Sequence, residues 1–132
     1  MPRRWILVVD DDPLMIKMLE EFLQGPDFTV TIASDAMQSF IQARDLKPAL
    51  VISDMVMPGG HTGDAALREL RKDEKLRAIP FIFVTGMEPS KAQALLPAGD
   101  PTVRLMTKPI DWELLRKNIE ELSGIKIAKE DA

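Results

Sequence analysis

The stretch ILVVDDDP, residues 6–13, decides most of what this sequence can fold into. Four consecutive apolar residues that favour extended structure predict a short strand covered on both faces. Asp12 followed by Pro13 is typical of a helix start, with the aspartate as N-cap and proline at the first helical position. A buried strand that leads through aspartates into a helix is the first half of a strand–helix–strand unit. The stretch therefore predicts a parallel sheet with polar groups at the end of its first strand.

The rest of the chain repeats this alternation of short apolar runs and longer amphipathic stretches. Further strands are predicted at residues 29–33, 49–53, 81–84 and 103–106. Helices are predicted at residues 13–24, 35–44, 64–72, 89–96 and 111–122, and residues 58–63 form a glycine-rich loop. Strands alternating with helices in this way predict an α/β fold with a five-stranded parallel sheet.

Strand composition predicts the order of the strands in the sheet. The first, third and fourth strands are continuously apolar, as central strands should be. The second strand alternates polar and apolar residues, and the fifth carries Arg104, so both are expected at the edges. These assignments fit the flavodoxin-like, doubly wound order 2-1-3-4-5. Right-handed crossovers then place the five helices on two faces, two on one and three on the other.

Composition excludes several functional classes. The chain has 132 residues, no cysteine, one histidine and a formal net charge of -4. Disulfide scaffolds, thiol nucleophiles and cysteine metal sites are therefore excluded, and an acidic chain is a poor candidate for direct nucleic-acid binding. No apolar run approaches the roughly 20 residues that span a bilayer, so we expect no membrane insertion and a cytoplasmic location. We expect one domain at residues 4–122 and a short charged tail at residues 123–132.

Oxygen ligands and one ammonium group follow the strands of the predicted sheet. Asp10 and Asp11 follow the first strand, Asp54 the third, Thr85 the fourth and Lys108 the fifth. Carboxyl ends of parallel strands meet at one edge, where repelling carboxylates favour a hard divalent cation, Mg²⁺ first and Mn²⁺ second. Asp54 could then act as a nucleophile that forms an aspartyl phosphate, with Lys108 pairing with the phosphate and Thr85 donating to it.

The same segments, in the same order, resemble the receiver domain of bacterial two-component response regulators. The resemblance covers about residues 4–122 and is carried by residues 6–13, 50–58, 85–86 and 107–109. It implies that Asp54 is the phosphoacceptor and that Asp11 is a direct metal ligand. It also implies that Asp10 acts beside Asp11, often through water, and that the backbone carbonyl of Val56 is a further ligand.

The resemblance also implies how the domain signals. Thr85 matches the switch hydroxyl and Lys108 the lysine of the family, with a cis bond to Pro109. A sensor histidine kinase or a phosphotransfer protein is the expected phosphodonor. No output segment follows Leu122, so unless the chain is part of a longer protein we expect output through protein contacts of the fourth helix, fifth strand and fifth helix.

Four features depart from the family pattern. Leu105 stands where the family usually has an aromatic residue, and Gly86 replaces a common alanine. The loop at residues 58–63 is one residue longer than usual. Pro97 shortens the fourth helix. These features leave two alternatives open, a degenerate receiver that acts as a constitutive interaction domain and an aspartyl-phosphate phosphatase. The phosphatase is disfavoured because Val56 stands where such enzymes commonly carry a second acid.

Overall fold

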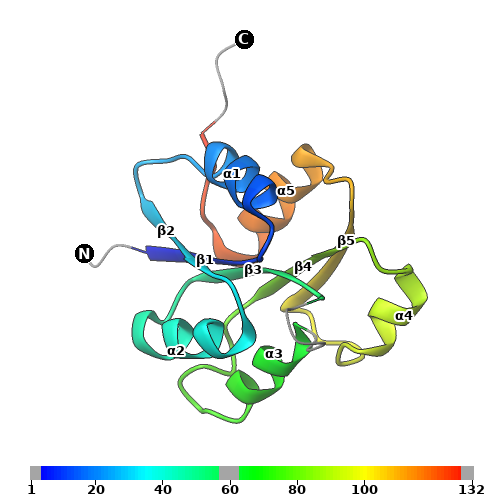
Figure 1. Cartoon of the computed structure of the whole chain (residues 1–132). Helices are drawn as coiled ribbons and strands as arrows, with labels where there is room; N and C mark the ends of the chain where they lie inside the picture. Colours follow the sequence, from blue (N-terminus) through cyan, green and yellow to red (C-terminus); the bar gives the residue numbers. More distant parts are fainter. Residues whose placement is uncertain (1–3, 57–62, 129–132) are drawn as a thin grey trace.

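The structure is a computed structural model, and it describes residues 4–56 and 63–128. Its five strands form one parallel sheet in the order β2-β1-β3-β4-β5 (Figure 1). The strands are β1 (Arg4–Val9), β2 (Phe28–Ala33), β3 (Leu50–Asp54), β4 (Phe81–Thr85) and β5 (Val103–Thr107). The flavodoxin-like order predicted from strand composition is confirmed. The predicted loop falls outside the described residues except for Gly63.

Two helices cover one face of the sheet and three cover the other, as predicted (Figure 1). Figure 1 places α1 and α5 on one side of the sheet and α2, α3 and α4 on the opposite side. The helices are α1 (Pro13–Phe22), α2 (Ala36–Leu46), α3 (Asp64–Arg71), α4 (Pro89–Ala94) and α5 (Trp112–Ser123). Three of them begin at the expected kind of residue, because the carboxylates of Asp12, Asp35 and Asp111 accept from backbone N–H groups of the first turn.

The continuous apolar run of β1 is buried on both faces, which is why the run does not alternate. Ile6 and Val8 belong to the core beneath α1 and α5, whereas Leu7 and Val9 belong to the core beneath the other three helices. All four side chains are at most 1% exposed. Burial of this kind supplies about 2 kcal/mol for each large aliphatic side chain, so the central strands fix the sheet firmly.

The fourth helix is shorter than its amphipathic pattern predicts. We predicted a helix to Leu96, but α4 ends at Ala94 after six residues. Pro97 disfavours helical geometry at the residue before it, so the last predicted turn does not continue. Only Ala92 of this helix is buried. The helix is therefore anchored to the domain by few side chains.

The segment after α5 differs from the charged tail expected from residue 123. The helix ends at Ser123, and Gly124 caps it with a φ of 73°, in the left-handed conformation. Ile125 and Ile127 are then 0% and 6% exposed and join the core beneath α1 and α5. The Ala128 N–H donates to the Gln24 carbonyl at 2.7 Å. Packed structure thus extends at least to Ile127, because both isoleucines are buried in the core.

Candidate functional site

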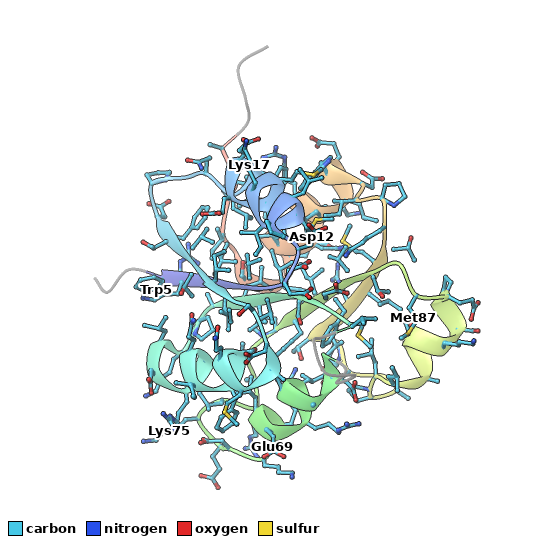
Figure 2. The ribbon with its side chains drawn as sticks, in the orientation of Figure 1. Trp5, Asp12, Lys17, Glu69, Lys75 and Met87 are labelled. Atoms are coloured by element: carbon cyan, nitrogen blue, oxygen red, sulfur yellow. The ribbon has the colours of Figure 1, made fainter. Side chains whose placement is uncertain are left out.

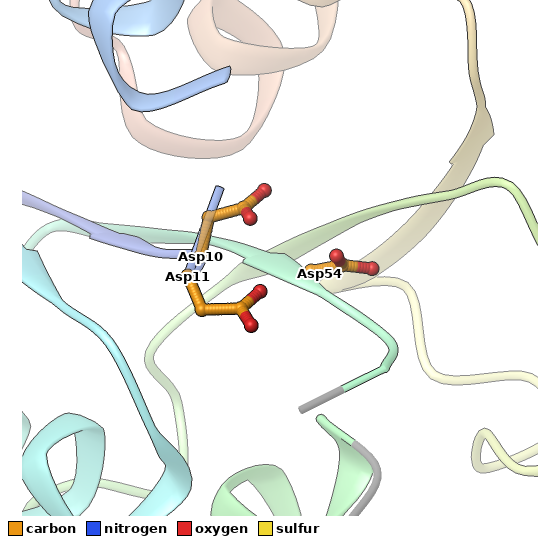
Figure 3. Close-up of side chains that lie close together, drawn as sticks. All are labelled: Asp10, Asp11 and Asp54. Carbon is orange, nitrogen blue, oxygen red and sulfur yellow. The ribbon is translucent and has the colours of Figure 1, made fainter. Parts of the chain in front are cut away.

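Three carboxylates meet at the carboxyl edge of the sheet, where the sequence predicted them. Asp10 and Asp11 follow β1 and Asp54 is the last residue of β3 (Figure 3). The two strands are neighbours in register, with Val9 opposite Ser53, so the next residues lie at the same level. A carboxylate oxygen of each aspartate lies within 4.8 Å of the others. The aspartates at the ends of two neighbouring strands thus form one acidic cluster.

Asp10 is the buried member of this cluster. It is 3% exposed, and one of its oxygens accepts a hydrogen bond from the Asp12 N–H at 2.9 Å. Burial raises the pKa of Asp10, and the negative charges of Asp54 and Asp11 act in the same direction. The Asp12 N–H and the ammonium of Lys108 lower the pKa but do not offset the rise. The positive charge around Asp10 is therefore too small to offset the burial of its ionised carboxylate.

Lys108 reaches the cluster from the segment after β5. Its Nζ lies 3.3 Å from Asp54 Oδ2 and 3.9 Å from Asp10 Oδ2. The Lys108 backbone N–H donates to the Thr85 carbonyl at 2.8 Å, which ties this segment to the end of β4. The bond from Lys108 to Pro109 is cis, as the resemblance implies. The Lys108 side chain is 27% exposed and lies beside two carboxylates.

Thr85 ends β4 and is completely buried. Its Oγ1 accepts a hydrogen bond from the Met87 N–H at 3.0 Å. Figure 2 labels Met87 beside α4, so this hydroxyl holds the turn through which β4 enters the short helix. The hydroxyl thus joins the edge of the sheet that carries the carboxylates to the start of α4.

Val56 lies two residues after Asp54 and is 52% exposed. Its N–H donates to Asp54 Oδ1 at 3.2 Å. The two oxygens of Asp54 therefore have different partners, Val56 on one and Lys108 on the other. The Val56 N–H therefore lies beside the acidic cluster, and the Val56 carbonyl remains a predicted ligand.

Gly63 is a residue of this region that our reading of the sequence missed. It precedes α3, and its N–H donates to the Met55 carbonyl at 2.8 Å. We interpreted the glycines between residues 59 and 63 as a loop that borders the phosphorylation site and is one residue longer than usual, and we assigned no role to Gly63 itself. Nothing in the local pattern distinguishes a glycine that punctuates a loop from one that packs against a strand, because that distinction depends on tertiary packing.

A five-stranded, doubly wound α/β domain with a carboxylate cluster and a lysine at the carboxyl edge of its sheet defines the class of this protein. The response regulator receiver domain family matches residues 6–120, and the chain belongs to this family. None of the described helices has the length and hydropathy that crossing a membrane requires.

Two curated relatives match most of this chain. Response regulator Rre1 of Synechocystis is 32% identical over 130 residues, covering 96% of this chain and 54% of that protein. Protein PilH of Pseudomonas aeruginosa is 35% identical over 114 residues, covering 86% of this chain and 93% of that protein. The chain thus spans about half the length of Rre1 and nearly all of PilH.

Solved structures share the fold over almost the whole chain. The signal receiver domain of a signal transduction histidine kinase from Syntrophus aciditrophicus has a TM-score of 0.78 at 26% identity and covers 98% of this chain and 97% of its own. A CheY-like receiver domain protein from Methanospirillum hungatei has a TM-score of 0.76 at 25% identity and covers 93% and 96%. Both similarities agree with the order of the five strands described above.

Proposed function

We propose that this domain accepts a phosphoryl group on Asp54 from a sensor histidine kinase or a histidine phosphotransfer protein. The observation that carries the proposal is the contact of Lys108 Nζ with Asp54, at 3.3 Å, within a cluster of three carboxylates. A lysine at a strand-end aspartate is a common ion pair. A lysine shared by two carboxylates beside a third is suited to a phosphoryl group and a cation.

The cluster has the donor chemistry that Mg²⁺ prefers. Asp10, Asp11, Asp54 and the carbonyl of Val56 offer oxygen ligands only, and Asp10 is buried without enough positive charge around it. These four groups would hold Mg²⁺. A cation bound there would neutralise charge that develops on the oxygens of a transferring phosphoryl group.

The transfer step uses Asp54 as the nucleophile. One oxygen of its carboxylate attacks the phosphorus of a phosphohistidine, so an O–P bond forms while the N–P bond breaks. The electron pair of the N–P bond stays on the imidazole nitrogen, which takes up a proton from water. Lys108 then pairs with the phosphoryl oxygens in place of the carboxylate that it contacts here.

The output of the site would pass through Thr85. Its oxygen accepts from the Met87 N–H, and among the described residues its own proton has no hydrogen-bond acceptor, so the hydroxyl can donate to a phosphoryl oxygen. Donation would move the hydroxyl toward Asp54 and alter the turn that leads into α4. The surface of α4, β5 and α5 is therefore our proposed contact surface for a downstream protein, with Leu105 repacking where relatives have an aromatic ring.

The chain's net charge of -4 supports a protein partner rather than direct nucleic-acid binding. We further propose that the domain works in the cytoplasm, where kinases of two-component systems present their phosphohistidine. We propose the site residues given above for this chain. We place the domain at residues 4–122 and add to it the packed segment that follows α5.

One experiment tests the phosphoacceptor. The protein is incubated with Mg²⁺ and acetyl phosphate, and its intact mass is measured beside that of Asp54→Asn. We expect a single phosphoryl adduct on the wild type and none on the variant, because the amide is not a nucleophile for phosphorus. The variant is a matched control, since it preserves the size and shape of the side chain.

The other outcomes identify the alternatives. Absence of an adduct with acetyl phosphate and with a phosphorylated kinase would favour a degenerate receiver that acts as a constitutive interaction domain. Multiple turnovers of a phosphate ester without an accumulating adduct would favour a phosphatase. An adduct that persists in Asp54→Asn would place the phosphoacceptor elsewhere.

A further inference from the structure

Gly63 lies closer to the backbone of Asp54 than any residue with a side chain can. A Cβ atom at this position would lie 2.2 Å from the Asp54 carbonyl oxygen. It would also lie 3.1 Å from Ser53 Oγ and 3.2 Å from Phe83 Cε1. The carbonyl belongs to a buried strand between two other strands, so it cannot move aside as the end of a flexible side chain would.

Backbone conformation does not explain the glycine. Gly63 has φ of -63° and ψ of -20°, in the right-handed helical region that every residue adopts. Gly99 and Gly124 differ, because each has a φ near 70° that favours glycine. Gly63 is therefore required by lack of space and not by its dihedral angles.

The residues around this contact also position the groups of the acidic cluster. The Gly63 N–H donates to the Met55 carbonyl at 2.8 Å, and the Ser53 hydroxyl donates to the Asp54 carbonyl at 2.9 Å. The next peptide places the Val56 N–H against Asp54 Oδ1. A displacement of the Asp54 carbonyl therefore moves both the carboxylate and the peptide that carries the Val56 carbonyl.

We propose that Gly63 is a positioning residue for the phosphoacceptor. Without a side chain at residue 63, α3 begins directly against the backbone of Asp54 and Met55. This close packing fixes the Asp54 carboxylate and the Val56 carbonyl in the arrangement that Mg²⁺ binding and phosphoryl transfer require. The inference rests on the proposed function, since it assigns Gly63 a part in that same site.

The test compares two glycine-to-alanine variants of the full chain. Gly63→Ala adds a methyl group where 2.2 Å is available. Gly99→Ala adds the same group in the loop before β5, outside the site, where nothing lies within 4 Å. Each protein is given Mg²⁺ and acetyl phosphate. The initial rate of phosphorylation is followed by intact mass, and the Mg²⁺ affinity is taken from the dependence of Tm on Mg²⁺ concentration.

We expect Gly63→Ala to slow phosphorylation by about tenfold to a hundredfold, because misplacing a reacting group by an ångström has effects of this size. Its affinity for Mg²⁺ falls as well. Gly99→Ala stays within about twofold of the wild type in rate and Mg²⁺ affinity, since its methyl group displaces nothing at the site, although the left-handed backbone at residue 99 lowers its Tm. The two variants share the same chemical change, so the contrast isolates the contact at residue 63.

Two results would overturn the inference. In one, Gly63→Ala matches Gly99→Ala in rate and Mg²⁺ affinity. In the other, Gly63→Ala has a lower Tm but a wild-type rate and affinity at a temperature where both proteins are folded, which is the behaviour of a purely structural glycine. If Gly63→Ala does not fold, Ser53→Ala takes its place. It removes the hydroxyl that holds the Asp54 carbonyl without adding bulk, and a wild-type rate would reject the proposed positioning.

The experiment separates this inference from the proposed function. If the wild type forms no adduct, phosphorylation of Asp54 is wrong, whatever Gly63 does. The Mg²⁺ titration still tests Gly63 in that case, because the affinity depends on the Val56 and Asp54 oxygens and not on phosphoryl transfer.

Discussion

Asp10 is the least exposed of the three aspartates in the acidic cluster, with 3% of its surface exposed. Asp11 at its side is exposed, and Asp54 is partly buried. Burial raises the pKa of Asp10, whereas Lys108 lowers it by direct attraction. Burial disfavours the ionised carboxylate of Asp10, and Lys108 favours it. The protonation of Asp10 therefore responds to any further charge that enters the site.

The raised pKa of Asp10 gives the metal-free protein a defined dependence on pH. Between the usual pKa of an aspartate and the raised folded value, the folded protein binds more protons than the unfolded chain. The contribution of Asp10 to the free energy of unfolding therefore falls as pH rises through this window and stays low above it. We expect Asp10→Asn to remove this dependence and to be more stable than the wild type at neutral pH without Mg²⁺.

Urea unfolding across a pH series, with EDTA and with Mg²⁺, measures this effect. Mg²⁺ should stabilise the wild type more than Asp10→Asn, because the variant has lost one ionised oxygen donor. The account of Asp10 is contradicted if the variant is less stable than the wild type at neutral pH in EDTA.

The elements that end near the site differ in how firmly they are anchored. Most residues of β1 and β3 and all of β4 are buried, whereas α4 has six residues and one buried side chain. A short helix held by Ala92 and by the Thr85–Met87 turn can change position at low cost in free energy. The element proposed to carry the output is therefore weakly held.

In contrast to α4, the segment after α5 is firmly anchored, because it closes the core beneath α1 and α5. Ile125 is fully buried there, whereas the neighbouring Lys126 side chain is 81% exposed. The Arg116 guanidinium donates to the Ile127 carbonyl at 2.6 Å and lies over the Phe22 ring, with its carbon 5.1 Å from the ring centroid. The segment is therefore part of the folded unit and not an appended tail.

Substitution of this segment tests its contribution. We expect Ile125→Ala to lower the free energy of unfolding by about 2–4 kcal/mol, because it removes buried methyl groups and leaves a cavity. Lys126→Ala is the matched control and should change the free energy by less than about 0.5 kcal/mol. Both values come from urea unfolding monitored by circular dichroism. A loss below about 1 kcal/mol for Ile125→Ala would mean that the segment does not pack as described.

At the scale of the whole molecule, the sequence predicted most of the architecture. The apolar runs at residues 6–9 and 81–84 indicated central strands, and Arg104 indicated an edge, because central strands exclude charge. Acidic residues after two strands predicted the cluster, since parallel strand ends share one edge of the sheet. These predictions were correct because each hydrophobic or charge pattern is compatible with only one position in the sheet.

Other features depended on packing that no local pattern records. Ile125 and Ile127 stand among charged residues, so composition favoured a tail, yet their alternation lets both face the core. The role proposed for Gly63 depends on how closely α3 approaches β3. The end of α4 before Pro97 depended on the local conformation ahead of proline.

The whole account depends on chain segments from β1, β3 and β5 meeting at one magnesium-binding cluster that activates Asp54. The most direct test locates the phosphoryl group. After incubation with acetyl phosphate, the acyl phosphate is reduced with borohydride and the modified residue is identified by peptide mass spectrometry. We expect modification at Asp54 in the presence of Mg²⁺ and its loss in EDTA. Modification at another residue, or equal modification of Asp54 without any divalent cation, would contradict the account.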